Sequence, residues 1–334
     1  MRLLILLLAA CTGAPGNGDS GDSAPWDRGP NPHALDDVLR FNHIQVKGTH
    51  NSYHLEPETV FDESHRYTHP TLTEQLDLWG VRQFELDLHR TEDTDQWHVF
   101  HLPGVDEETS CLRFTDCLAE IKAWSDDHGW HLPITIWIEP KDEIDGLAAD
   151  YREIEPEDLF ALDTDIRSVF PEDRLFTPDD LRQGYDTLPA ALAAEGWPTL
   201  GEIRGQVLFS MLDTGDDREA YSAGAPALEG RAMFVDTSTE TDAYAALVKD
   251  GSPEDITRWV EAGFIITDNG SRAADDDAAA EASDSAILTA GVHHAATDLP
   301  APVDGRAYWL DLSPRCNPVS APTECDDSEI ETLD

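Results

Sequence analysis

Short apolar and β-branched runs recur along the chain from about residue 33 onward, and segments with helical spacing of apolar residues lie between most of them. The pattern predicts eight strands, at residues 43–48, 81–88, 97–102, 134–138, 206–212, 232–236, 263–267 and 291–296. Strand alternating with helix, eight times over, favours a parallel sheet closed into a (β/α)8 TIM barrel. An open doubly wound sheet is the alternative, but no glycine-rich dinucleotide-binding turn follows an early strand.

Several helices between these strands have clear sequence signals. Thr71 and Glu74 form a capping box at the start of one helix, and Gly80 stands where its C-cap belongs. Two further amphipathic helices are predicted around residues 118–124 and 159–169. The polar, Ala- and Asp-rich stretch 268–284 is predicted to form a loop and an exposed helix after the seventh strand.

The first eleven residues differ from the rest of the chain. A charged start, an apolar run and two alanines precede Cys11, which fits a secretory signal and is too short to span a bilayer. The ending 8–11 resembles a bacterial lipoprotein signal, whose cysteine becomes the lipidated N-terminus; an ordinary cleaved signal is the alternative. We therefore expect a signal at 1–11, a flexible polar linker at 12–32 and a single barrel domain at 33–334.

The charge balance separates classes of partner. The chain has 22 Lys and Arg against 68 Asp and Glu, a formal net charge of −46. Such a surface repels phosphate backbones, so nucleic-acid binding is not expected. Anionic membranes also repel it unless metal ions intervene. The simplest interpretation is a solvated acidic shell that keeps the protein soluble.

Four cysteines remain after Cys11, and an even number outside the cytoplasm predicts two disulfides. Four cysteines allow three pairings. We expect the two local ones, because loop closure costs least at short sequence separation. These pairs are Cys111–Cys117 and Cys316–Cys325.

Polar residues suited to chemistry follow the first four predicted strands. Glu85 and Asp87 are two apart on a strand, so both side chains lie on one face that would otherwise be apolar. Neighbouring carboxylates repel each other, and a divalent cation removes the conflict. Asn51 and Glu139 complete four oxygen ligands of the kind that Ca²⁺ or Mg²⁺ takes. Such a set does not fit a typical zinc site.

His50 and His101 are expected to flank this metal on neighbouring strands. Imidazole titrates near neutrality, and a pair can serve as base and acid in phosphodiester cleavage. The metal would stabilise charge on the phosphate, and Lys141 could contact the phosphate as a point charge. Each residue alone is a weak signal; the coincidence at consecutive strand ends carries the functional interpretation.

Four segments stand out in combination: 47–53 (KGTHNSY), 80–87 (GVRQFELD), 101–106 (HLPGVD) followed by Cys111, and 138–142 (IEPKD). Together they resemble the bacterial Ca²⁺-dependent phosphatidylinositol-specific phospholipase C family, and the likeness runs from about residue 33 to residue 318. The resemblance implies a TIM barrel of the phospholipase C-like phosphodiesterase type. It also implies attack by the inositol 2-hydroxyl of phosphatidylinositol, which releases diacylglycerol and a cyclic inositol phosphate, with Ca²⁺ favoured over Mg²⁺.

The resemblance also assigns roles and partners. His50 and His101 match the catalytic pair, with His50 favoured as base and phosphate stabiliser and His101 as acid. The metal ligands match Asn51, Glu85, Asp87 and Glu139. A phospholipid at a membrane surface is the implied substrate. With Cys11 lipidated, the protein is expected to be an exported monomer anchored in the bacterial cell envelope; without lipidation it would be secreted.

One departure from the family and two rival functions stay open. Relatives often have an arginine at the end of the seventh strand, where this chain has 267–269 (TDN); Arg272 is the candidate substitute, so head-group preference is open. Glycerophosphodiester phosphodiesterases are similar around the Glu-x-Asp motif, but they pair their first histidine with arginine, unlike His50-Asn51. A surface lipoprotein that binds inositol lipids without turnover is the second rival, although a binder needs no acid–base pair.

The remaining histidines receive structural interpretations. His98 is expected on the opposite strand face from His101, and His89 beside the metal ligands. His293 and His294 are adjacent on a strand, so only one can face the barrel interior. The first loop holds three more histidines, for which exposed positions are expected: His54, His65 and His69.

Overall fold

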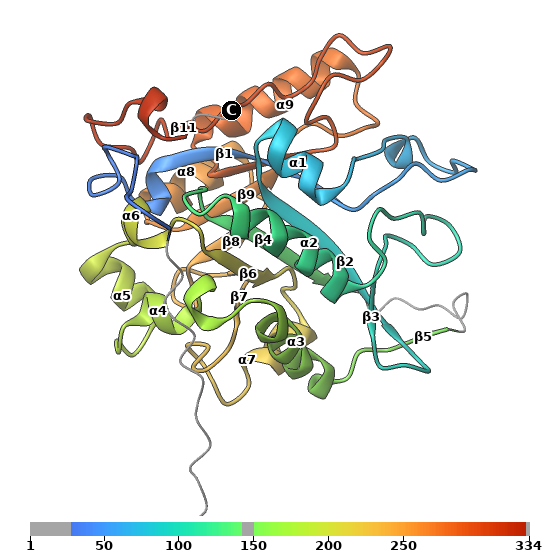
Figure 1. Cartoon of the computed structure of the whole chain (residues 1–334), viewed down its shortest axis with the longest axis horizontal. Coiled ribbons are helices and arrows are strands. Elements are labelled where there is room, and N and C mark those ends of the chain that lie inside the picture. Colours follow the sequence, from blue (N-terminus) through green and yellow to red (C-terminus); the bar gives the residue numbers. More distant parts are fainter. Residues whose placement is uncertain (1–27, 142–149, 332–334) are drawn as a thin grey trace, which may run out of the picture.

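The computed structural model describes residues 28–141 and 150–331, so the signal predicted at 1–11, Cys11 and most of the linker lie outside the described residues. Eight parallel strands form the barrel (Figure 1). In chain order they are β1 (Ile44–Thr49), β2 (Val81–Thr91), β4 (Ile134–Pro140), β6 (Val207–Met211), β7 (Met233–Val235), β8 (Leu247–Lys249), β9 (Ile265–Asn269) and β10 (His294–Thr297).

Strand pairing closes this sheet almost completely. Each barrel strand pairs in parallel with the next, and β10 pairs with β1. Between β7 and β8 the contact is a single parallel bridge from Asp236 to Leu247. The predicted TIM barrel is therefore confirmed, with its weakest seam between β7 and β8.

The strand predicted at 97–102 is not a barrel strand. β3 (Trp97–Val99) pairs antiparallel with β2, with Leu88 opposite Val99. The joining segment 92–96 is too short for a parallel connection, which needs about a dozen residues or more. The prediction missed β8 instead, because its three residues include only two apolar side chains before a lysine, whereas the equally short β7 is apolar throughout. Two further short strands, β5 (Tyr151–Arg152) and β11 (Arg315–Cys316), pair antiparallel with β2 and β1.

Helices cover the outside of the barrel (Figure 1). The α1 helix begins after Thr71, whose side chain accepts from the backbone N–H of Glu74, and it ends at Gly80 in the left-handed conformation, as predicted. The α-helices are α1 (Leu72–Trp79), α2 (Phe114–Asp127), α3 (Pro156–Val169), α4 (Pro178–Arg182), α5 (Leu188–Glu195), α6 (Leu200–Ile203), α7 (Asp216–Ser222), α8 (Pro253–Glu261) and α9 (Asp277–Ala290). The 3-10 helices are η1 (Phe41–His43), η2 (Glu63–His65), η3 (Glu172–Arg174) and η4 (Asp327–Glu329).

Successive side chains of each barrel strand point alternately into the barrel and outward toward the helices, and both faces are buried. The Trp137 indole N–H donates to Thr267 Oγ1 at 2.9 Å, and the His294 ring lies 2.8 Å from the same oxygen. His293 instead bonds the backbone of Ile266 and Asn42, outside the barrel, so only His294 faces the interior, as predicted. Because Glu139 is two residues beyond Trp137, the same inward face turns from packed side chains to carboxylates at the strand end.

Close approach of β1 and β2 requires a glycine at position 48. A Cβ on Gly48 would lie 1.9 Å from Oε1 of the buried Gln83 side chain. The glycine lets β1 lie against β2 immediately before the chain reaches His50. The KGTHN segment therefore has a packing reason as well as a chemical one.

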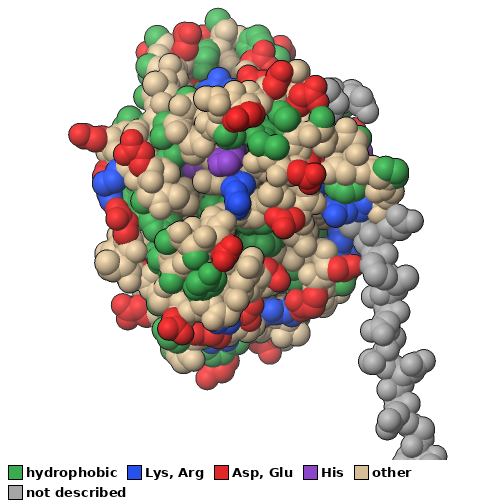
Figure 2. Space-filling model, turned by 90° about the vertical axis from the view of Figure 1, so that its left-hand side faces the viewer, with side chains coloured by type: hydrophobic (Ala, Val, Ile, Leu, Met, Phe, Trp, Pro, Cys, Tyr) green, Lys and Arg blue, Asp and Glu red, His purple; other side chains and the backbone are tan. Residues whose placement is uncertain are grey.

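Both predicted disulfides are present, Cys111–Cys117 and Cys316–Cys325. The first ties the loop after β3 to the start of α2, and the second ties β11 to the C-terminal segment. On the face shown in Figure 2, acidic side chains are dispersed rather than gathered in one patch, which agrees with an acidic shell. Across residues 28–141 and 150–331, no helix combines the length and apolar character that crossing a membrane requires.

Candidate active site

Three carboxylates meet at the carboxyl end of the barrel, where β2 and β4 lie side by side. Asp87 is paired with Glu139 across these strands, and Glu85 is paired with Trp137 one step deeper. Glu85, Asp87 and Glu139 each offer an oxygen within 4.8 Å of the others. The sequence prediction that these three side chains converge is confirmed.

The backbone on either side of Asn51 is bonded to two barrel strands. Its neighbour His50 donates from the backbone to Thr297 of β10, and Ser52 donates to the carbonyl of Glu85 on β2. Asn51 itself is buried and has a φ of 42°, in the left-handed region that asparagine tolerates better than most residues. A non-glycine residue held in this conformation at a strand end is typical of functional positions.

The electrostatics of the carboxylate group fit a divalent cation. Burial and, after it, the neighbouring Asp87 together raise the pKa of Glu139 to about 7, against the opposing effect of Lys141. Burial also raises the pKa of Asp87, whose Oδ1 has no hydrogen-bond partner. Carboxylate oxygens that repel one another, with one of them lacking a hydrogen-bond donor, are suited to a hard cation such as Ca²⁺ or Mg²⁺.

Two lysines partly neutralise these carboxylates. Lys141 Nζ lies 2.6 Å from Glu139 Oε1 and 3.1 Å from Asp87 Oδ2. Lys249 Nζ, at the end of β8, lies 3.1 Å from Glu85 Oε2 and is almost fully buried. Sequence reasoning proposed Lys141 as a phosphate contact and missed Lys249 together with its strand. In this structure both ammonium groups bind candidate metal ligands.

His50 is oriented by a buried aspartate that follows β10. Nδ1 of His50 lies 2.8 Å from Asp298 Oδ1, and Nε2 lies 3.6 Å from Glu85 Oε1. Burial alone would lower the pKa of His50, but Asp298 and Glu85 outweigh it and raise the pKa. Arg272 Nη1 lies 3.3 Å from His50 Nε2, so the candidate substitute for the family arginine does reach the site.

His101 has an equivalent carboxylate partner, supplied by a loop. Its Nδ1 lies 2.9 Å from Asp106 Oδ2. His89 on β2 lies 3.0 Å from the carbonyl oxygen of Phe100 and 3.2 Å from that of His101, and so holds the backbone of this turn. His101 reaches the barrel mouth because β3 runs back along β2, and not because a parallel strand ends there.

The three histidines of the first loop are buried, so the expectation of exposed positions was wrong. His54 Nε2 lies 3.0 Å from both oxygens of Asp106, and its Nδ1 lies 3.1 Å from the carbonyl oxygen of Tyr67. His69 Nε2 lies 3.1 Å from the carbonyl oxygen of His50. His65 packs its ring against that of His101 with centroids 5.2 Å apart. The loops after β1 and β3 extend on the same side of the molecule, which explains this convergence (Figure 1).

The remaining predicted residue, His98, lies apart from these groups. It contacts the hydroxyl of Tyr151 at 3.1 Å, consistent with the opposite strand face. A cavity of about 510 Å³ opens beside the carboxylates and is lined by His101, Glu139 and Lys141, with Asp213 on its far side. The site therefore has room for a small polar group next to both His101 and the metal ligands.

Solved structures with a similar fold come from two bacterial enzymes. A structure of the apo calcium-dependent phosphoinositol-specific phospholipase C from Pseudomonas sp is 20% identical, with a TM-score of 0.58, and the match covers 85% of this chain and 97% of that one. The myo-inositol complex of the Pseudomonas enzyme gives 20% identity, a TM-score of 0.58 and coverage of 84% and 96%. The structure of the Ca²⁺-dependent phosphatidylinositol-specific phospholipase C from Streptomyces antibioticus is 19% identical, with a TM-score of 0.56, and the match covers 78% of this chain and 95% of that one. These likenesses show the fold.

The family follows from the sequence itself. No curated protein matches this chain. The sequence model described as "Phosphoinositide phospholipase C, Ca2+-dependent" matches residues 39–98 and 90–318, which is most of the chain. The matched range contains both imidazole–carboxylate pairs and all of the candidate metal ligands. The chain therefore belongs to the Ca²⁺-dependent phosphoinositide phospholipase C family of enzymes.

Proposed function

We propose that this enzyme cleaves phosphatidylinositol to diacylglycerol and a cyclic inositol phosphate. One observation carries the proposal: two imidazoles, each bonded through Nδ1 to a buried carboxylate, lie at the two ends of the carboxylate group. His50 is next to Glu85, and His101 shares a cavity with Glu139. Such an arrangement suits in-line displacement at phosphorus, because base and acid act on opposite sides of the reacting atom.

The proposed proton transfers follow from the tautomers. Asp298 accepts from Nδ1 of His50, which leaves Nε2 to take the proton from the inositol 2-hydroxyl as its oxygen attacks phosphorus. Asp106 accepts from Nδ1 of His101; in the acid form the ring carries a second proton on Nε2, which it gives to the glycerol oxygen as the phosphorus–oxygen bond breaks. The products are diacylglycerol and the 1,2-cyclic phosphate. Arg272, beside His50, is placed to bind a phosphate oxygen.

We propose Ca²⁺ as the cofactor, held by Asn51, Glu85, Asp87 and Glu139. When bound, the cation would stabilise charge on the phosphate oxygens and lower the pKa of the attacking hydroxyl. Lys141 now shares two of these carboxylates, so it would turn toward the substrate phosphate once they are neutralised. Glu85 would then pull less strongly on the His50 proton, which favours the base form of His50.

We also propose that the enzyme works as a monomer at a membrane surface. The substrate is a membrane lipid, and anchoring through a lipidated Cys11 in the bacterial cell envelope would hold the barrel near it. Cys11→Ala should move the protein from the membrane fraction to the soluble fraction. Unchanged fractionation would refute anchoring by lipidation and leave secretion or another attachment.

Phosphorus NMR of the products tests the reaction. Phosphatidylinositol vesicles are incubated with the full chain and Ca²⁺, and in parallel with excess EGTA. A cyclic inositol phosphate is expected with Ca²⁺, with no product under EGTA and recovery when Ca²⁺ is restored. Glycerol-3-phosphate from glycerophosphoinositol, with intact phosphatidylinositol, would instead indicate a glycerophosphodiester phosphodiesterase. Activity that survives EGTA would remove the cation from the mechanism.

A further inference from the structure

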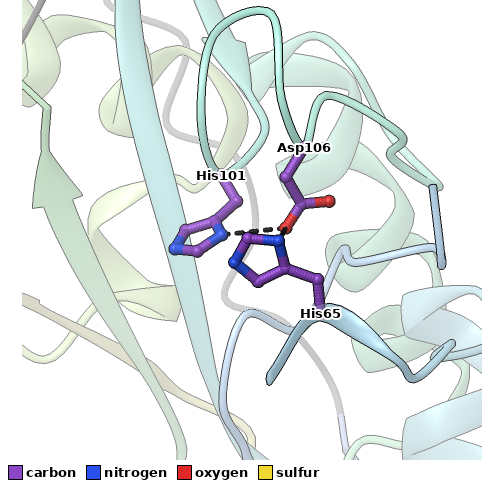
Figure 3. A group of neighbouring side chains, drawn as sticks. All are labelled: His65, His101 and Asp106. Atoms are coloured by element: carbon purple, nitrogen blue, oxygen red, sulfur yellow. Dashed lines mark hydrogen bonds and ion pairs between the residues drawn. The ribbon is translucent and has the colours of Figure 1, made fainter. Parts of the chain in front are cut away.

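A second group of possible metal ligands lies beside the first and has different chemistry. His65, His101 and Asp106 each offer one ligand atom, and all three atoms lie within 4.8 Å of one another (Figure 3). His101 Nδ1 is 2.9 Å from Asp106 Oδ2, and His65 Nδ1 is 3.6 Å from the same oxygen. The two rings stand almost perpendicular, at 87°, with both Nδ1 atoms turned toward the carboxylate.

His65 has a nitrogen without a hydrogen-bond partner. The residue is only 8% exposed, and its Nδ1 is buried and unpaired. A buried polar atom without a partner is uncommon in a folded protein and points to an absent ligand. His54, on the other side of Asp106, contacts both carboxylate oxygens at 3.0 Å and fixes the orientation of the carboxylate. Outer partners of this kind are what metal-binding carboxylates require.

The distances fit a small transition-metal ion. Tetrahedral zinc with bonds of roughly 2.0–2.2 Å places its ligand atoms about 3.3 Å apart, between the two measured nitrogen–oxygen distances. Two imidazole nitrogens and one carboxylate oxygen suit zinc, whereas calcium takes oxygen ligands. One of the three residues, His101, lines the cavity beside the carboxylates, so the group lies next to a space that an ion can enter.

We propose that His65, His101 and Asp106 form an inhibitory Zn²⁺ site. Binding releases the Nδ1 proton of His101 to solvent and replaces the His101–Asp106 hydrogen bond with two metal bonds. The imidazole then can no longer act as a general acid toward the leaving oxygen. The inhibitory effect rests on the proposed function, whereas the binding of the ion does not.

Direct binding tests the site without using activity. Zn²⁺ is titrated into the full chain, with Ca²⁺ held at saturation, in competition with a chromophoric zinc chelator. One site is expected in the wild type. His65→Gln and His65→Phe should each weaken it by about 10-fold or more, because loss of a ligand costs at least as much as loss of an outer partner. His65→Phe keeps an aromatic ring packed against His101, so the site can still be tested with this variant if His65→Gln does not fold.

His98→Gln is the matched control, since it removes a histidine on the same side of the molecule but outside the group. It should leave Zn²⁺ affinity unchanged. Equal affinity in the wild type and both His65 variants would overturn the site. Nitrogen-15 NMR of labelled histidine supplies a second readout: two Nδ1 resonances should shift on Zn²⁺ addition in the wild type, and a spectrum without such shifts would also contradict it.

Activity then tests the inhibitory role. At saturating Ca²⁺, Zn²⁺ should lower the wild-type rate, and each His65 variant should resist Zn²⁺ relative to its own metal-free rate. Inhibition that is unchanged in the variants and relieved by more Ca²⁺ would place the ion on the Glu85–Asp87–Glu139 group and contradict the proposal. Zn²⁺ bound at His65 without any loss of rate would contradict inhibition but not the site. If the protein cleaves no phosphodiester at all, the Zn²⁺ titration still shows whether the ion binds at His65.

Discussion

The candidate active site consists of two halves that the fold supports differently. One half is borne by barrel strands: His50 follows β1, the carboxylates lie on β2 and β4, and Asp298 follows β10. The other half is borne by loops: His101 and Asp106 follow β3, with His54 from the loop after β1. Each half holds a histidine through Nδ1 on a buried carboxylate. The same chemical unit is thus built once on rigid strand ends and once on a network of loop side chains.

The two supports differ in how many groups depend on the carboxylate. Asp298 bonds the His50 ring and the backbone N–H of Ala273. Asp106 faces three rings, with His65 the most distant at 3.6 Å. A strand end needs little further support, because the sheet already fixes the backbone. In the loop half, side-chain bonds take the place of the sheet. Its geometry therefore depends on the two oxygens of Asp106, which three imidazoles share.

Removing the two imidazoles should have the largest effects and should separate the halves chemically. His50→Ala is expected to lower kcat by on the order of 10² or more with any inositol phosphodiester, since it removes the base. His101→Ala should cost a similar factor with phosphatidylinositol. With an activated aryl leaving group, which needs no proton, the His101→Ala loss should shrink while the His50→Ala loss persists.

Steady-state rates on both substrates make this measurement, and circular dichroism of each variant confirms the fold. If the activated leaving group rescued His50→Ala and not His101→Ala, the two roles would be exchanged. Equal losses on both substrates for both variants would show that neither histidine is specific to the leaving group.

Asp106 and Asp298 have the same proposed role, but replacing them should lower the stability of the protein by different amounts. In Asp106→Asn, the amide offers one acceptor oxygen where the carboxylate receives bonds from His54 and His101, and its NH₂ group faces ring donors. Leaving buried donors without partners costs about 1–3 kcal/mol. Asp298→Asn should cost less, because only one imidazole depends on Asp298, whereas three imidazoles face Asp106.

Urea unfolding of the two variants beside the wild type gives the free energies of unfolding. Asp298→Asn serves as the matched control, since it makes the same chemical change at an equally buried site. If the free energy of unfolding fell more in Asp298→Asn than in Asp106→Asn, the loop half would not depend on its carboxylate more than the strand half does.

The strand half could be predicted from the sequence, and the loop half largely could not. Glu85, Asp87 and Glu139 follow from the two-residue period of strands and from the rule that parallel strand ends share one edge. Asp298 gives the same signal, a polar residue directly after a strand, and could have been found in that way. Lys249 was missed because its strand has only two apolar residues and so gives no apolar run.

Loop positions carry no such period. His54, His65 and Asp106 meet only because two loops fold over the same side of the barrel, and local spacing does not encode that contact. His101 was correctly brought to the site for an incorrect reason: the expected parallel strand is the second arm of a hairpin. The segment 101–106 indicated the chemistry correctly, although the apolar run at 97–102 predicted the wrong strand direction.

The smallest expected difference is in the pH dependence of stability without Ca²⁺. Burial alone would raise the pKa of Asp106, but hydrogen bonds from His101 and His54 outweigh it and lower the pKa. A lowered carboxyl pKa stabilises the fold above the unfolded value of about 3.9 and loses that contribution as pH falls. The raised pKa of His50 acts in the opposite direction: its contribution is complete below about 6.5 and is lost as pH rises through the folded value.

Asp106→Asn should therefore flatten the acid side of a plot of Tm against pH, and His50→Gln should flatten the side above neutrality. Each effect should be no more than about 2–4 °C, the shift that 1 kcal/mol produces in a domain of this size. Differential scanning calorimetry from pH 3 to pH 9 in EGTA makes the comparison. Because Asp298 also has a lowered pKa, which His50 helps to lower, His50→Gln should change the acid side as well. An acid side that is as steep in Asp106→Asn as in the wild type would contradict the contribution inferred for the Asp106 carboxylate.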